Sequence, residues 1–84
     1  MAKVIDNLDK NLFLLFKKLF DINKSVWRDD LTINEIIGWD SISAINFFNE
    51  LENEFEIIFE PDDLFEVRKI ENIKKLIMKK IENS

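Results

Sequence analysis

Apolar residues recur at spacings of three and four positions in three stretches of the chain, residues 5–20, 42–55 and 71–81. That spacing is typical of amphipathic helices, which bury one face against a core. Pro61 favours the first turn of a further short helix that ends near residue 66, with Asp62 and Asp63 at its favourable end. The pattern therefore predicts an all-α fold, a small four-helix bundle of three main helices plus a short third helix.

A long first loop separates the first two predicted helices. Residues 21–32 are polar and irregular, and we expect them to pack on the domain through the few apolar side chains among them. These are Val26, Trp27 and Leu31. Residues 32–35, Thr-Ile-Asn-Glu, have the spacing of a capping box and favour a short helical turn, after which the only glycine, Gly38, interrupts the chain.

The helix predicted over residues 42–55 has a buried stripe and two apolar residues outside it. At about 100° per residue, four side chains cluster on one side, with Phe47 at their edge. They are Ala44, Phe48, Leu51 and Phe55. Ile42 and Ile45 stand off this stripe, on the side that carries asparagine and glutamate. They either form a contact surface for a partner or pack beneath the loop or the last helix, and the pattern leaves both open.

The composition removes most catalytic chemistry. The chain has no Cys, His or Tyr, so thiol nucleophiles and the usual general base are missing, and we expect neither an enzyme nor a metal site. The 84 residues, 46% of them hydrophobic, are expected to form a single domain over 1–84. The first residues lack a signal-peptide pattern and no apolar run reaches roughly 18 residues. We therefore expect a cytoplasmic protein without membrane insertion. We also expect it to act as a monomer.

The charges are segregated along the chain. The net charge is −5, which argues against nucleic acid as a partner, because phosphate binding needs clustered Lys and Arg. Residues 1–28 carry a net +3 and residues 68–84 a net +4, whereas residues 29–67 carry twelve acidic side chains and no basic one. Such a segment is either a solvated face or a folded anionic surface that steers cationic partners.

Gly38, Trp39, Asp40 and Ser41 form a Gly-x-Asp-Ser motif ahead of the second main helix. Asp and Ser are both common N-cap residues, so the pair has a purely structural interpretation as a helix start. The functional alternative is an exposed hydroxyl on a tight turn, where free amide groups and the helix dipole favour a covalent phosphate. Gly38 would allow the turn, and Asp40 is a candidate ligand for the divalent cation that phosphoryl transfer requires.

Three stretches resemble the acyl and peptidyl carrier protein family. The first is residues 38–42, Gly-Trp-Asp-Ser-Ile, followed by a helix that ends in Leu-Glu-Asn-Glu-Phe at residues 51–55. The others are residues 59–66, Phe-Glu-Pro-Asp-Asp-Leu-Phe-Glu, and residues 70–73, Ile-Glu-Asn-Ile, which look like the third and fourth helices of that family. The resemblance covers roughly residues 31–81, and the chain length and the amphipathic first helix agree with it.

The resemblance implies that a phosphopantetheinyl transferase moves 4'-phosphopantetheine from coenzyme A onto Ser41. The arm would carry acyl or aminoacyl groups as thioesters to biosynthetic enzymes. Enzymes of this family recognise the helix after the serine through acidic and apolar residues, which implies partners with basic patches. The matching candidates are Ile42, Ile45, Glu50, Glu52, Glu54 and Glu56. The core either parts to shelter an acyl chain or is filled by its phenylalanines.

Departures from the family pattern bear on the pathway. Carriers of primary fatty acid synthesis usually have acidic residues where Ser43 and Asn46 stand, and Trp39 resembles carriers of specialised pathways. A carrier for polyketide, peptide or surface-polymer synthesis is therefore favoured over one for fatty acid synthesis. The alternative function is an unmodified helical adaptor that binds a basic protein partner through its acidic face.

Overall fold

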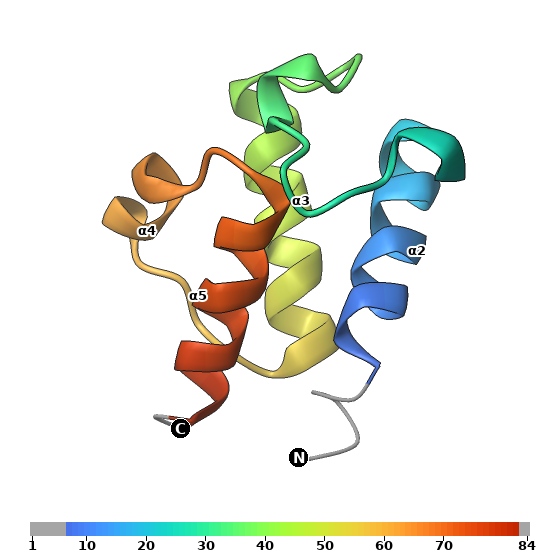
Figure 1. The fold of residues 1–84 in the computed structure, drawn as a ribbon. Helices are drawn as coiled ribbons and strands as arrows, with labels where there is room; N and C mark the ends of the chain where they lie inside the picture. Colours follow the sequence, from blue (N-terminus) through green and yellow to red (C-terminus); the bar gives the residue numbers. More distant parts are fainter. Residues whose placement is uncertain (1–6, 83–84) are drawn as a thin grey trace.

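The described part of the chain, residues 7–82 of a computed structural model, is built from helices. They are α2 (Leu8–Phe20), α3 (Ser41–Phe55), α4 (Pro61–Glu66) and α5 (Ile70–Glu82), with the 3₁₀ turns η1 (Lys24–Val26) and η2 (Ile33–Glu35). Figure 1 shows α2, α3 and α5 side by side, with the short α4 to one side of α5. The all-α bundle with its short third helix and long first loop is confirmed, although residues 5 and 6 of the first predicted helix lie outside the described residues. None of the described helices is long and apolar enough to cross a membrane.

The core lies between α2, α3 and α5. Among the described residues, these helices contribute the largest fully buried side chains, which are Leu12, Phe16, Phe47, Leu51, Ile70, Ile73 and Ile77. Burying an aliphatic or phenyl side chain of this kind stabilises a fold by about 1.5–3 kcal/mol. Phe47, which the helix wheel placed at the edge of the buried stripe, lies at its centre because the Phe16 ring packs against it.

An aromatic cluster connects this core to the turn ahead of α3. The ring centroids of Phe16 and Phe47 lie 4.4 Å apart at its centre. Trp39 packs beside them, with its ring centroid 5.4 Å from that of Phe20 and 5.6 Å from that of Phe47. Aromatic pairs contribute about 0.5–1.5 kcal/mol beyond the area they bury. The residue directly before Asp40 is thus fixed to both α2 and α3.

The long first loop is held on the bundle by Trp27. Its ring centroid lies 5.4 Å from that of Phe16, and its indole N–H donates to the Asp9 carboxylate at 3.0 Å. Leu31 is buried, as predicted. The predicted anchoring by Val26 is wrong, because this residue ends the unforeseen turn η1, none of whose side chains is buried, and is 41% exposed.

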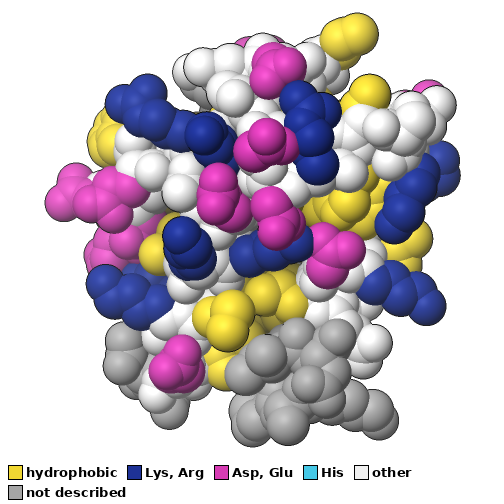
Figure 2. All heavy atoms as spheres, viewed as in Figure 1, with side chains coloured by type: hydrophobic (Ala, Val, Ile, Leu, Met, Phe, Trp, Pro, Cys, Tyr) yellow, Lys and Arg dark blue, Asp and Glu magenta, His cyan; other side chains and the backbone are white. Residues whose placement is uncertain are grey.

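Ion pairs join α5 to acidic side chains elsewhere in the chain, two of them in the acidic segment of residues 29–67. Lys74 of α5 contacts both Asp9 of α2 and Asp29 of the loop, and Lys80 lies 2.8 Å from Asp63 of α4. The hydrogen bond from Lys74 holds the pKa of Asp9 below its usual range. Figure 2 shows Lys and Arg side chains beside Asp and Glu side chains on one face of the molecule. The charge segregation along the sequence is therefore reduced in space.

Candidate functional site

A reciprocal pair of hydrogen bonds starts α3. The Asp40 carboxylate accepts from the Ser43 N–H at 2.8 Å, and the Ser43 hydroxyl oxygen accepts from the Asp40 N–H at 2.8 Å. This capping box satisfies amide groups that a helix start leaves without partners. Asp40 is therefore the N-cap and Ser41 the first helical residue, whereas the sequence left both as cap candidates. The hydrogen bond from the Ser43 N–H lowers the pKa of the Asp40 carboxyl, which stays ionised at neutral pH.

Gly38 forms the tight turn ahead of this cap. Its φ of +95° lies in a region where residues with a side chain are strained. A Cβ atom here would lie 3.6 Å from Cδ1 of Phe20, which is an ordinary contact, so conformation rather than space requires the glycine. The Gly38 carbonyl oxygen accepts from the Ser43 hydroxyl at 2.8 Å and so ties the turn to α3.

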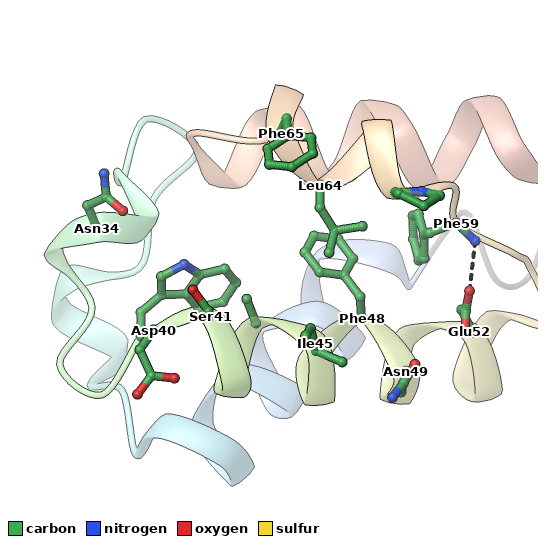
Figure 3. Close-up of a pocket in the computed structure, with 13 residues that line it drawn as sticks. Asn34, Asp40, Ser41, Ile45, Phe48, Asn49, Glu52, Phe59, Leu64 and Phe65 are labelled. Atoms are coloured by element: carbon green, nitrogen blue, oxygen red, sulfur yellow. Dashed lines mark hydrogen bonds between the residues drawn. The ribbon is translucent and has the colours of Figure 1, made fainter.

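The Ser41 hydroxyl is exposed and unengaged. No group among residues 7–82 makes a side-chain hydrogen bond with it, whereas the Ser43 hydroxyl is bonded to both Gly38 and Asp40. In Figure 3, Ser41 points to the side of α3 that faces α4, and Asp40 points away. A negative group on Ser41 would lie at the N-terminus of a 15-residue helix, where the helix dipole favours it by about 0.3–1 kcal/mol.

A groove of about 740 Å³ opens beside Ser41, between α3 and α4 (Figure 3). Its lining residues are Asn34, Trp39, Asp40, Ser41, Ala44, Ile45, Phe48, Asn49, Glu52, Phe59, Pro61, Leu64 and Phe65. Leu64 of α4 projects across it toward Phe48 of α3. Mostly apolar walls with a few polar groups are typical of sites for small organic molecules. A group attached at Ser41 would therefore have an apolar groove directly beside it.

The two isoleucines that follow Ser41 are exposed to solvent. Ile42 is 74% exposed and Ile45 is 53% exposed. The sequence left open whether they pack beneath the loop or the last helix, and this exposure excludes that alternative. Their part in binding a partner stays a prediction.

The glutamates of α3 differ in their contacts. The Glu52 carboxylate accepts from the Phe59 N–H at 2.8 Å, which closes the turn toward α4 and leaves its other oxygen for a partner. The carboxylates of Glu50, Glu54 and Glu56 have no ion pair or hydrogen bond within residues 7–82. The last turn of α3 has no basic residue, so the charges there oppose the helix dipole.

Two features near the site were missed from the sequence. Ser43 binds both sides of the turn, and the Asp-x-x-Ser spacing of a capping box is a signal that identifies it. Phe65 of α4 is 79% exposed beside the groove. No periodicity signals this exposure, because a helix of six residues is too short to define a buried face.

Comparison with known proteins shows the class to which the chain belongs. A family model described as the phosphopantetheine attachment site matches residues 12–77. The solution structure of a holo acyl carrier protein from Geobacter metallireducens is 26% identical, with a TM-score of 0.79, and the match covers 92% of this chain and 88% of that one. No curated protein sequence matches the chain. The chain belongs to the phosphopantetheine-attachment carrier proteins, the acyl carrier protein family.

The prosthetic group of this carrier is 4'-phosphopantetheine, and the protein is a non-catalytic carrier rather than an enzyme. The predicted family and cofactor are thereby confirmed. The start of α3 fits the group, because it offers a free hydroxyl at a helix N-terminus beside an open groove. When bound, the group supplies a thiol, which the sequence lacks.

Gly38→Ala should lower the free energy of unfolding by about 1–2 kcal/mol, because a Cβ atom disfavours the positive φ. Gly38→Asn should lower it less, since Asn tolerates positive φ better than Ala. Urea unfolding followed by tryptophan fluorescence measures both variants. An Ala variant as stable as the wild type, or more stable than the Asn variant, would contradict the conformational role of Gly38.

Proposed function

We propose that Ser41 carries the phosphopantetheine arm and that the protein presents acyl or aminoacyl thioesters to biosynthetic enzymes. The observation that carries this assignment is the exposed, unengaged Ser41 hydroxyl at the N-terminus of α3. In the transfer, Ser41 Oγ bonds to the phosphorus that holds the pantetheine in coenzyme A. The bond from that phosphorus to the leaving adenosine 3',5'-bisphosphate breaks, and the serine proton passes to a base of the transferase.

Asp40 supports this step through its charge. Its exposed carboxylate accepts from the Ser43 N–H and retains acceptor capacity for the divalent cation that accompanies phosphoryl transfer. This carboxylate is negative at neutral pH, and the hydrogen bond from the Ser43 N–H lowers its pKa further below neutrality. Gly38 contributes by setting the turn that precedes the cap.

The exposed face of α3 is the proposed docking surface for the transferase and for biosynthetic enzymes with basic patches. Ile42 and Ile45 supply apolar contacts, and the unpaired Glu50, Glu54 and Glu56 supply charge. Glutamates in the last turn of a helix destabilise it through the dipole. Glu54 and the C-cap residue Glu56 lie at this end of α3, and an arrangement that weakens the fold locally supports a functional role for their charges.

We further propose a specialised pathway and a cargo held outside the core. Ser43, Asn46 and Trp39 support polyketide, peptide or surface-polymer synthesis over fatty acid synthesis. Phe16 and Phe47 fill the centre of the bundle, so a long acyl chain would have to displace them, whereas the groove between α3 and α4 is open.

The protein would act in the cytoplasm as a monomer. The unmodified adaptor is set aside, because the family carries a prosthetic group.

Incubation with a phosphopantetheinyl transferase, Mg²⁺ and coenzyme A tests the attachment residue. Intact-mass measurement should show one added arm on the wild type and none on Ser41→Ala. Ser25→Ala, which removes another exposed serine hydroxyl, should be modified like the wild type. An arm on Ser41→Ala, or a wild type that stays unmodified with several transferases, would reject the assignment.

Changing Glu50, Glu54 and Glu56 together to Gln tests the docking surface. Loss of the negative charge should slow association with a partner enzyme about tenfold at low salt and flatten its salt dependence. Stopped-flow binding measures the rate. Urea unfolding should show no loss of stability, since Glu54 and Glu56 lie where negative charge opposes the helix dipole and Glu50 makes no ion pair or hydrogen bond among the described residues. Glu82→Gln, which removes a charge from α5 instead, is the control. A triple variant with the wild-type rate at low salt would show that this face is only solvated.

A further inference from the structure

The Ser43 hydroxyl joins the two sides of the turn that leads into α3. Its oxygen accepts from the Asp40 N–H at 2.8 Å, and it donates to the Gly38 carbonyl oxygen at 2.8 Å, which is nearer than the Asp40 carbonyl oxygen at 3.2 Å. The Ser43 N–H also donates to the Asp40 carboxylate. Ser43 is thus bonded to both residues that frame the turn, and Ser41 lies between the bonded positions.

These bonds hold the backbone from which the Ser41 side chain projects. Helix ends fray when their amide groups lack partners, and the direction of a side chain at the end then varies with the backbone. The rings of Phe20 and Phe47 hold Trp39. The segment before Ser41 is therefore held by packing at Trp39 as well as by the hydrogen bonds of the Asp40 cap. The Ser41 hydroxyl has no partner of its own among the described residues. The backbone therefore sets where the Cβ of Ser41 lies, and no neighbouring group holds its hydroxyl.

We propose that Ser43 is a positioning residue for the modification of Ser41. Its hydroxyl holds the first turn of α3 so that the backbone presents Ser41 to the transferase from one position. This inference rests on the proposed function, because it takes Ser41 as the acceptor. Misplacing a reacting atom by about 1 Å can lower a rate about 10²-fold. The hydrogen bonds of the Ser43 hydroxyl should therefore affect the rate of the transfer step. Binding of the transferase should depend instead on the exposed face of α3.

Only a hydroxyl at position 43 makes both bonds. It accepts from the Asp40 N–H and donates to the Gly38 carbonyl, whereas a carboxylate only accepts. Glu is a good third residue of a capping box, so Ser43→Glu would retain the first bond and lose the second. Ser43→Thr would retain both, and Ser43→Ala would lose both. The series separates the helix cap from the bond to Gly38.

Steady-state kinetics of arm transfer to these variants, with one transferase and saturating coenzyme A, test the proposal. We expect Ser43→Ala to lower kcat about tenfold and to leave KM for the carrier within about twofold of the wild type. Ser43→Thr should have the wild-type kcat, and Ser43→Glu should resemble Ser43→Ala. Ile45→Ala, which alters the proposed docking surface, should instead raise KM with little change in kcat.

Two controls separate positioning from loss of the fold. Circular dichroism and urea unfolding establish that each variant is folded at the assay temperature, and Ser25→Ala, which removes an exposed hydroxyl from η1, should behave like the wild type. Hydrogen exchange of the Asp40 amide, which donates to the Ser43 hydroxyl, should be faster in Ser43→Ala than in the wild type. In Ser43→Thr this amide should exchange at the wild-type rate.

Three results would overturn the proposal. They are a wild-type kcat in folded Ser43→Ala, a wild-type kcat in Ser43→Glu, and a rise in KM without a fall in kcat. Failure of the Ser41 assignment would look different. It would appear as an arm on Ser41→Ala, whatever the kinetics of the Ser43 variants.

Discussion

The hydrogen bond from the Ser43 N–H to the Asp40 carboxylate is the interaction on which the site depends. A helix start needs a cap, and Asp and Ser both supply one. Because Asp40 takes the cap position, Ser41 becomes the first helical residue and its hydroxyl accepts nothing from the helix. Had Ser41 been the cap, its oxygen would be occupied, and modification would compete with the fold. A difference of one residue in the cap thus separates a serine whose hydroxyl is used by the fold from one whose hydroxyl is free.

The site is fixed on the inside and open on the outside. Trp39 connects the turn to the aromatic centre of the bundle, where the Phe16 and Phe47 rings lie 4.4 Å apart. Ile42 and Ile45, which follow Ser41 on α3, are exposed, and the groove between α3 and α4 lies beside them. A carrier needs both properties, because its attachment residue must hold one position while many enzymes reach it. The tightly packed core supplies the first and the exposed face of α3 the second.

The sequence predicted the helices because each buries a stripe with helical periodicity. It misplaced Phe47 and Val26, since burial there depends on a neighbouring ring and on a 3₁₀ turn that no single periodic pattern shows. The charge pattern along the sequence overestimated how much negative charge is left without a basic neighbour. In the fold, α5 packs so that Lys74 and Lys80 form ion pairs with acidic side chains from elsewhere in the chain. The Gly-x-Asp-Ser motif pointed to the proposed site, but its two adjacent residues have similar capping preferences, so the sequence gave no means of deciding which one forms the cap.

The central claim is that the Ser41 hydroxyl, left free by the Asp40 cap, bears the prosthetic group. Fragmentation mass spectrometry of the carrier purified from cells that contain a phosphopantetheinyl transferase tests it most directly, because it locates the phosphodiester on a single residue. We expect the arm on Ser41, with Ser25 and Ser43 unmodified. An arm on Ser43 or Ser25, in protein whose Ser41 is unmodified, would contradict it.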